Sequence, residues 1–370
     1  MNKWKAEKIG LGDFDGESII NVAQNSVSSS ILDIKKLLST SKKVVIVPHK
    51  NPDGDAMGSA LGLCLYLKKK GHIATVIAPN DYPEFLKWLP DNDEVINYEM
   101  ENSISENIIS SADVIFTLDF NILHRCGEME TPIKNANAVK IMIDHHQEPD
   151  SYADYTYSDV NMCSTSQMVY HFIEKMEDLN YIDIAIGEAL YTGIMTDTAS
   201  FRFPLTTSIT HKVIAQLIEL GVQKSKIHDA IYDTNSFGRL QLLGCAMNNL
   251  QFLENYSTSY ITLTKKELDY HRFKKGDTEG FVNYGLSLKG AKLAAIFIEH
   301  KQEGIIKISF RSKGDFDVNK FARNHFNGGG HKNASGGRSN LNLEDTISKF
   351  TNLLTEYELE LNSWNRLNFT

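Results

Sequence analysis

The sequence contains no run of about 18 or more apolar residues, so no membrane-spanning helix is expected. Its N-terminal stretch, MNKWKAEKIGLGDFDGESII, lacks the apolar segment of a secretory signal. The four cysteines, Cys64, Cys126, Cys163 and Cys245, occur without CxxC spacing, which argues against a zinc ribbon or a disulfide scaffold. We therefore expect a cytoplasmic protein with reduced thiols.

An excess of basic charge is also absent, because 38 Lys and Arg residues face 47 Asp and Glu residues, for a net charge of −9. Proteins that coat long nucleic acids neutralise many phosphates with Lys and Arg. An acidic chain can bind phosphate only through a local pocket or bound cations, which favours short anionic ligands over long duplexes. The 370 residues, 42% of them hydrophobic, predict two domains of ordinary size.

The order of apolar segments predicts an α/β protein. Four Val- and Ile-rich runs in the first half alternate with helical patterns, as in a parallel sheet with helices on both faces: KKVVIVP, IATVIA, ADVIFTLDF and AVKIMIDHH. The second half contains three more strand-like runs and two helical patterns, interrupted by NGGGHKNASGG. We expect an extension over 1–26, a first domain over 27–234, a helical linker over 235–253 and a smaller α/β domain over 254–370.

Four segments bring metal-ligand residue types to what we expect to be one edge of the first sheet. In open parallel sheets the ligand site lies beyond the carboxyl ends of the strands. The residues concerned are His49, Asp53, Asp55, Asp119, Asp144, His145, His146 and Asp197.

Each of these segments has a simpler explanation when taken alone. Asn51-Pro52-Asp53-Gly54 is a good turn in which Asp53 could cap the next helix, and Asp119 could be a cap as well. His145 and His146 could be ordinary histidines at a strand end. Together, however, five carboxylates and three imidazoles would crowd one crevice without compensating positive charge.

The donor set indicates which ions could compensate. Oxygen and imidazole ligands without a thiolate favour Mn²⁺, with Mg²⁺, Fe²⁺ or Co²⁺ as alternatives. Six or more ligands exceed the needs of one ion with open positions. Two ions roughly 3.5–4 Å apart that share a carboxylate use the set fully, and such a pair suits phosphoester hydrolysis.

The second domain offers candidate phosphate contacts. Gly328, Gly329 and Gly330 directly precede His331, and their backbone N–H groups could form an anion nest, although a flexible turn is the simpler interpretation. Arg311 ends the strand-like run IKISFR and could bind a phosphate with two hydrogen bonds, although an arginine there is more often simply solvated.

These motifs resemble those of a known family. HKNPDGDAMGS, TLDFN, DHH and GIMTDT resemble the four motifs of the DHH phosphoesterase superfamily, and RSK, DVNKFA and NGGGHKNASGG resemble its DHH-associated C-terminal domain. Their order and length are similar to the NrnA-like nanoRNase and pAp-phosphatase branch, from about residue 30 onwards. The resemblance implies the following roles: His49 and Asp53 on one Mn²⁺; Asp55, His145 and Asp197 on the other; Asp119 bridging; His146 beside the scissile phosphate; Asp144 supporting the histidines.

The resemblance also implies that the second domain binds the nucleotide and that the active site lies between the domains. Arg311 and His331 would contact phosphate, with Gly329, Gly330 and Ser335 around them; Lys313 and Asn333 are weaker candidates.

The expected function is a Mn²⁺-dependent phosphoesterase that degrades short oligoribonucleotides (nanoRNA) to mononucleotides and dephosphorylates 3′-phosphoadenosine 5′-phosphate (pAp). The sequence leaves open a cyclic di-AMP or pApA phosphodiesterase, a RecJ-like single-strand exonuclease and a non-catalytic nucleotide-binding module. Expected partners are short RNA and small nucleotides, without long duplexes or a membrane. The oligomeric state, a homodimer included, stays open.

Overall fold

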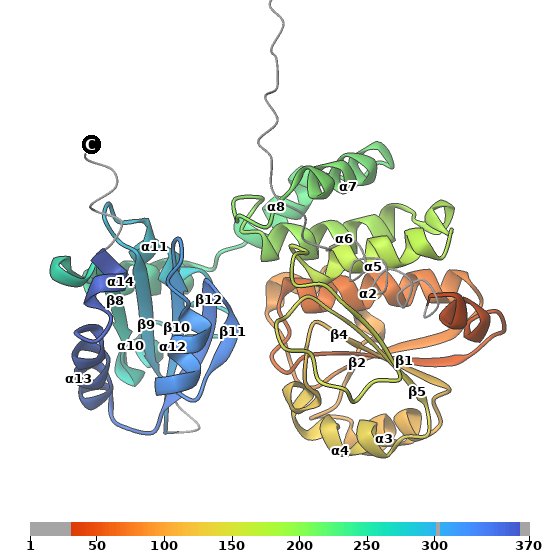
Figure 1. Ribbon diagram of the computed structural model, residues 1–370, viewed down its shortest axis with the longest axis horizontal. Helices are drawn as coiled ribbons and strands as arrows, with labels where there is room; N and C mark the ends of the chain where they lie inside the picture. The colour runs from red at the N-terminus through yellow and green to blue at the C-terminus, as the bar shows by residue number, and fades with distance from the viewer. Residues whose placement is uncertain (1–30, 301–303, 363–370) are drawn as a thin grey trace, which may run out of the picture.

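The structure is a computed structural model that describes residues 31–300 and 304–362. The expected extension over 1–26 therefore lies outside the described residues. Two α/β domains, each built on a six-stranded sheet, lie next to each other (Figure 1). Within the described ranges no helix is long and apolar enough to cross a membrane.

The first sheet is entirely parallel, with the strand order β3-β2-β1-β4-β5-β6. Its central strands are continuous Val- and Ile-rich runs because both of their faces are buried. The short β3 and the polar β6 lie at the two edges, and neither was expected from the sequence. The strands are β1 (Lys43–Pro48), β2 (Ile73–Ala78), β3 (Ile96–Asn97), β4 (Val114–Leu118), β5 (Val139–Asp144) and β6 (Tyr155–Ser158).

Helices cover both faces of this sheet, as expected (Figure 1). One face carries α2 (Gly54–Lys69), α5 (Thr165–Lys175) and α6 (Ile184–Asp197); the other carries α3 (Asn102–Ser110) and α4 (Glu130–Asn135). Two further helices, α7 (Ser208–Glu219) and α8 (Lys224–Tyr232), lie beyond α6. A Cβ on Gly58 would lie 2.5 Å from the Ala189 carbonyl oxygen, so α2 and α6 pack with their backbones in close approach.

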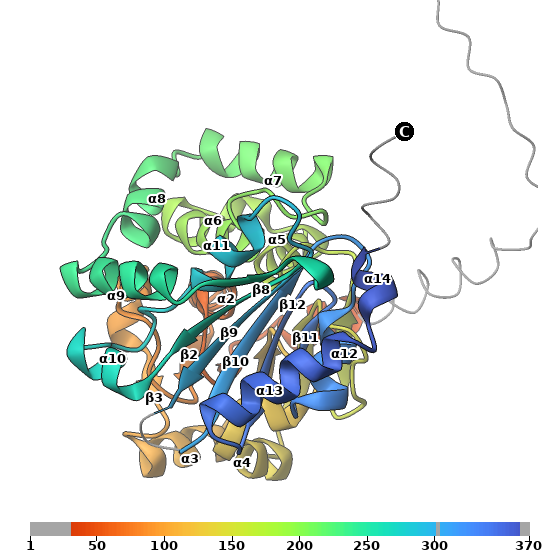
Figure 2. The same ribbon diagram turned by 90° about the vertical axis from the view of Figure 1, so that its left-hand side faces the viewer.

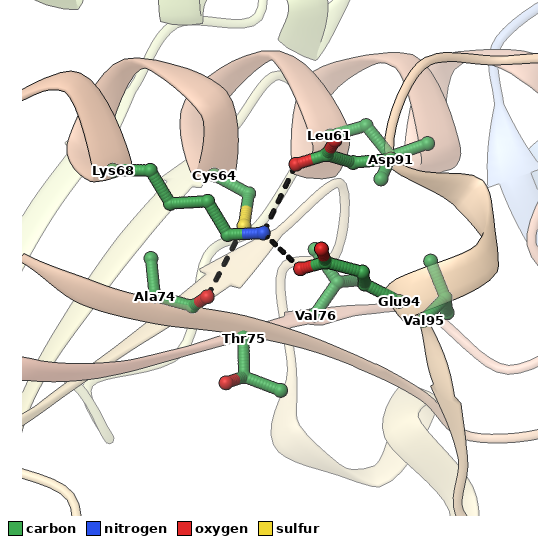
Figure 3. A pocket seen from close by; sticks show the side chains of 9 residues that line it. All are labelled: Leu61, Cys64, Lys68, Ala74, Thr75, Val76, Asp91, Glu94 and Val95. Atoms are coloured by element: carbon green, nitrogen blue, oxygen red, sulfur yellow. Dashed lines mark hydrogen bonds and ion pairs between the residues drawn. The ribbon is translucent and has the colours of Figure 1, made fainter.

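Lys68 joins the end of α2 to the loop that follows β2. Its ammonium group forms ion pairs with Asp91 and with Glu94 of the short helix η2 (Asn92–Glu94), as Figure 3 shows. The neighbouring cavity, lined by Cys64 among others, has a volume of about 30 Å³. That is room for about one water molecule, so this cavity serves packing rather than ligand binding.

The second sheet is mixed, with the strand order β11-β12-β10-β9-β8-β7, and only its β8–β9 pair is parallel. The strands are β7 (Gln251–Leu253), β8 (Thr258–Leu263), β9 (Leu293–Glu299), β10 (Ile306–Ser312), β11 (Gly329–His331) and β12 (Ala334–Ser339). The Gly-rich segment that was expected to interrupt the pattern is therefore the β11–β12 hairpin. Glycine is needed there because a Cβ on Gly328 would lie 2.0 Å from the Gly336 carbonyl oxygen.

The two faces of the second sheet are covered differently. One face packs over its length against α12 (Val318–His325) and α13 (Leu343–Leu354), which lie in front of it in Figure 2. On the other face, α9 (Phe237–Asn248) and α11 (Phe281–Ser287) pack against β8 and β9. The β10–β12–β11 part of that face is directed toward the first domain (Figure 1). The short helices α10 (Lys265–Tyr270) and α14 (Glu358–Asn362) complete the domain.

The expected linker over 235–253 contains α9 and β7. Leu242 and Ala246 of α9 are buried in the core of the second domain, and β7 pairs with β8. Both elements thus pack as parts of the second domain.

Candidate metal centre

The chain order reverses at β1, whose neighbours in the sheet are β2 and β4. Such a switch point creates a crevice at the carboxyl ends of the strands. His49 directly follows β1, Asp119 follows β4, and Asp144 ends β5 just before His145 and His146. Asp197 is the last residue of helix α6 (Ile184–Asp197).

The first group of potential ligands is His49, Asp53 and Asp119. The Nε2 atom of His49 lies 3.7 Å from Asp53 Oδ2 and 3.4 Å from Asp119 Oδ2. The other ring nitrogen, Nδ1, lies 2.9 Å from the Lys50 carbonyl oxygen and must donate its proton there. Nε2 is directed at the carboxylates, and after losing its proton it offers the lone pair that a metal ligand needs.

Asp53 combines the two roles that its sequence context suggested. It is the N-cap of α2, where Oδ1 accepts hydrogen bonds from the N–H groups of Asp55 (3.0 Å) and Ala56 (3.1 Å). Its Oδ2 atom is directed at His49. The cap therefore fixes the carboxylate while one oxygen stays available as a ligand.

The second group is Asp55, His145 and Asp197. The Nε2 atom of His145 lies 3.9 Å from Asp55 Oδ2, 3.4 Å from Asp197 Oδ2 and 3.5 Å from Asp119 Oδ1. Its Nδ1 atom lies 3.0 Å from the Met162 carbonyl oxygen, so Nε2 is again the nitrogen that is available to a metal once it has lost its proton.

Asp119 connects the two groups. One of its oxygens is directed at His49 and the other at His145, and the residue is 3% exposed. Its backbone has a φ of +65°, which is uncommon outside glycine and turns the side chain at the end of β4. A carboxylate in this position can bridge two cations.

Sequence reasoning missed the residues that hold two of these carboxylates. The N–H groups of Thr165 and Ser166, at the start of α5, donate to the two oxygens of Asp55 at 2.6 and 2.8 Å. The Thr165 hydroxyl donates to Asp119 Oδ1 at 2.9 Å. The only local signal is Ser164-Thr165-Ser166-Gln167, which has the form of a helix start.

The charges of the site leave a surplus of negative charge. Burial raises the pKa of Asp55, and the Asp119 and Asp197 charges raise it further. Burial and neighbouring carboxylates likewise raise the pKa of Asp197 to about 7. Burial alone would lower the pKa of His145, but the hydrogen bond to Asp119 and the nearby carboxylates hold it well above its usual value. Carboxylates that retain protons and imidazoles that take them up both show a site short of positive charge, so this donor set fits divalent cations.

Asp144 and His146 form a further group with Asp119, whose Oδ1 atom lies 3.7 Å from His146 Nδ1. His146 Nδ1 lies 2.7 Å from Asp144 Oδ1, and the His146 N–H donates to Asp144 Oδ2 at 3.1 Å. Burial raises the pKa of Asp144 to about 6, while burial and Arg125 keep the pKa of His146 well below its ordinary value. Asp144 therefore orients a neutral imidazole whose Nε2 is available.

The second domain adds His331 and Arg311 to the site. The His331 ring lies 4.2 Å from the ring of His146 and 4.7 Å from that of His145, measured between centroids. Arg311 lies in the same row of the second sheet as His331, because both pair with Ala334. Burial lowers the pKa of the Arg311 guanidinium, and the charges of Glu279, Asp197 and Asp53 counteract that shift. Outside the site, Arg323 forms an ion pair with Glu148 (2.6 Å) that joins the two domains.

Two N–H groups of the Gly-rich segment donate within the second domain. The N–H of Gly330 donates to Asn319 Oδ1 at 3.1 Å, and that of Gly328 donates to the Ala322 carbonyl. Ser335 is buried, and its hydroxyl donates to the His331 carbonyl at 3.0 Å. Gly330 and Ser335 therefore position His331, whereas Gly329 lies on the same face as His331. Of the weaker candidates, Asn333 donates to the Ser312 hydroxyl at 2.9 Å.

Comparison with known proteins agrees with this geometry. The model of the DHH family, N-terminal domain, matches residues 43–194, and that of the DHHA1 domain matches residues 257–358. The solved structure of an exopolyphosphatase-related protein from Bacteroides fragilis is similar, with 38% identity, a TM-score of 0.86, and coverage of 90% of this chain and 98% of that one.

Two other proteins are more distant. The bifunctional oligoribonuclease and PAP phosphatase NrnA of Bacillus subtilis is 28% identical over 82% of this chain and 91% of its own length. RecJ of Thermus thermophilus, solved in complex with Mn²⁺, shares the fold at 12% identity and a TM-score of 0.50, over 90% of this chain and 55% of that one. The chain belongs to the DHH family of phosphoesterases, with a DHH domain followed by a DHHA1 domain.

Proposed function

We propose that the protein is a phosphoesterase dependent on two divalent cations, with Mn²⁺ as the preferred ion, that hydrolyses short oligoribonucleotides to mononucleotides and removes the 3′-phosphate of pAp. The observation that carries the proposal is the Asp119 carboxylate, which is directed at His49 with one oxygen and at His145 with the other. The name of the Bacillus subtilis relative, which gives both activities, supports the choice of substrates.

The residues divide into two ligand sets. His49, Asp53 and Asp119 would hold one cation, and Asp55, His145 and Asp197 would hold the other together with Asp119. When bound, such a pair of cations neutralises phosphate charge and supplies a water molecule that is acidic enough to attack at neutral pH.

The remaining side chains bind and orient the phosphate. His146 is fixed by Asp144 through Nδ1, so its Nε2 is the atom that can contact the substrate or accept a proton. The positive charge of Arg311 interacts with Glu279, Asp197 and Asp53. Its guanidinium donates from Nη1 to the Phe310 carbonyl at 3.0 Å. A guanidinium so placed can form two hydrogen bonds to a phosphate. His331 would contact the same phosphate from the second domain.

A substrate panel tests the proposal. The purified protein with Mn²⁺ is offered pAp, diribonucleotides to pentaribonucleotides, cyclic di-AMP, pApA and a long single-stranded DNA. We expect turnover of pAp and of the short RNAs to mononucleotides. Ring opening of cyclic di-AMP that is faster than hydrolysis of linear dinucleotides would replace the proposal with a cyclic-dinucleotide phosphodiesterase. Preference for long DNA would indicate a RecJ-like exonuclease, and no turnover at all would indicate a binding module.

A further inference from the structure

The open face of β10, β12 and β11 has its side chains in three rows. The register pairs Arg311 with Ala334, and Ala334 with His331, which forms the row next to the candidate metal centre. The next row, also set by this register, consists of Ser309, Gly336 and Gly329.

The third row carries two cations, because Lys307 pairs with Arg338. Paired residues in an antiparallel ladder, and residues two apart along a strand, lie on the same face. The burial of β10 alternates accordingly, with Ile306, Ile308 and Phe310 in the core of the domain. Lys307 and Arg338 therefore lie on the same face as Arg311 and His331, and Arg338 is exposed.

The distance between the rows suits a chain of nucleotides. Four residues along a strand span about 13 Å, so Lys307 lies that far from Arg311 along β10. This is more than one sugar–phosphate repeat. In the middle row only Ser309 has a side chain, because the other two members are glycines. A Cβ on Gly336 would meet no atom closer than 3.8 Å. The surface between the two charged rows is therefore open to a sugar or a base.

Lys275 lies within electrostatic reach of Lys307 of the third row and of Lys50 of the first domain. Lys50 directly follows His49, and its ammonium lies 3.8 Å from Glu99. Lys275 donates to the backbone carbonyl of Asp81 in the first domain. Burial lowers the pKa of Lys275, and the charges of Lys307 and Lys50 lower it further, against the opposing effect of Asp81 and Glu99. Three lysines thus share one region at this end of the sheet.

Arg338 has no obvious role in the structure itself. Within the part of the chain that the structure describes, its guanidinium forms no hydrogen bond or ion pair, and its backbone N–H donates to the Phe326 carbonyl at 2.7 Å. An exposed arginine beside a lysine on the substrate-facing side of a sheet has the chemistry of a phosphate contact.

We propose that Arg338 and Lys307 form a second phosphate subsite, which binds a phosphodiester about two nucleotides away from the one held at Arg311 and His331. The inference rests on the proposed function and deepens it: the preferred substrate is a linear oligonucleotide of three or more nucleotides, whereas pAp and dinucleotides occupy only the first row.

The test compares substrates of different length with matched variants. Arg338→Gln and Lys307→Gln remove one cation each, and Lys320→Gln, on the exposed side of α12, is the control. Values of kcat/KM are measured for pAp, a diribonucleotide and a pentaribonucleotide between about 50 and 200 mM salt. We expect each subsite variant to lose about threefold to tenfold toward the pentamer, through KM. The salt slope for the pentamer should shrink by about 0.7 for each cation removed.

Activity toward pAp and the dinucleotide should stay within about twofold of wild type, as should every activity of Lys320→Gln. Equal losses toward pAp and the pentamer, or no loss toward the pentamer, would overturn the second subsite while leaving the proposed function intact. A wild-type protein that turns over neither substrate would overturn the proposed function and this inference with it.

Discussion

The imidazole of His331 stacks on that of His146, with ring centroids 4.2 Å apart and ring planes inclined by 25°. One ring comes from the second domain and the other from the motif that ends β5, so the contact brings the two domains together at the candidate metal centre. Burial lowers the pKa of both histidines well below the ordinary value, so both rings are neutral. Neutral rings can stack without charge repulsion, and each retains a nitrogen for hydrogen bonding.

Replacing His331 should weaken phosphate binding without emptying the metal centre. For His331→Ala we expect kcat/KM toward pAp to fall roughly 10- to 150-fold. This range corresponds to the loss of one hydrogen bond to a charged group, which contributes about 1.5–3 kcal/mol. Steady-state kinetics gives the loss, and metal analysis should find the wild-type Mn²⁺ content. The exposed His124, replaced in the same way, is the control. Loss of Mn²⁺ from the His331 variant would instead make this residue a ligand.

Removing the shared carboxylate should abolish activity. In Asp119→Ala both ligand groups lose their common member, so we expect nearly all turnover to disappear while the far-ultraviolet circular dichroism spectrum stays that of wild type. Calorimetric titration should show that tight Mn²⁺ binding is lost as well. The fully exposed Asp315, replaced by Ala, should change neither property. An Asp119→Ala variant with substantial activity would refute the two-cation site.

The sequence could predict that most of the proposed ligand residues lie together, because they follow a recognisable strand or cap a helix. Asp53 illustrates this well, since the turn and the cap that its neighbours encode are what orient its carboxylate toward His49. Asp197, which was predicted as a site residue, is the last residue of α6. The apolar pattern of α6 shows that this helix is buried, whereas the packing of α6 on α2 decides where the end of the helix lies.

Other parts of the site depend on contacts between distant segments. Thr165 donates to Asp119, which is 46 residues away, and no local pattern encodes that pairing. The same holds for the β11–β12 hairpin: the sequence left open whether its glycines form an anion nest or a turn, and the close approach of neighbouring strands is what requires glycine at Gly328. Ser335 falls on the buried face for the same reason, because the strand register, which the sequence alone does not fix, sets its direction.

The charge state of the ligand residues without metal predicts how metal binding depends on pH. Burial alone would lower the pKa of His49, but its hydrogen bonds to Asp119 and Asp53 raise it to about 10. The imidazole is therefore protonated at neutral pH without metal, and it must lose that proton to bind one. We expect Mn²⁺ binding to release protons and to tighten as the pH rises from about 6 to 9. Calorimetry in buffers of different ionisation enthalpy measures the number released; proton uptake would contradict the expected ligand roles.

The raised pKa values of His49 and Asp197 predict how the stability of the metal-free protein changes with pH. His49, with its pKa raised above 6.5, stabilises the fold at low pH and loses that contribution as the pH rises toward about 10. Asp197, with a pKa raised to about 7, acts in the same direction, because the folded state holds a proton that the unfolded state has already released. The melting temperature without metal should therefore fall between pH 6 and pH 9. With saturating Mn²⁺ the melting temperature should instead rise with pH. A melting temperature that rises with pH in the absence of metal would contradict the prediction.

The turn that follows Asp197 should be stabilised by glycine. Ala199, Ser200 and Phe201 have φ values of 49°, 61° and 66°, three consecutive left-handed residues that carry a Cβ. A left-handed residue with a Cβ destabilises the folded state by roughly 1–2 kcal/mol, and glycine avoids this strain. Glycine also has more conformational freedom in the unfolded state, which offsets part of the gain. For Ala199→Gly we expect a free energy of unfolding that is higher by up to about 1 kcal/mol. The control is Ala230→Gly in the interior of α8, which should lower it by about 0.5–1 kcal/mol, because there φ is helical and only the entropy is lost. Urea denaturation measures both changes, and a destabilised Ala199→Gly would show that the methyl group contributes packing that outweighs the backbone strain.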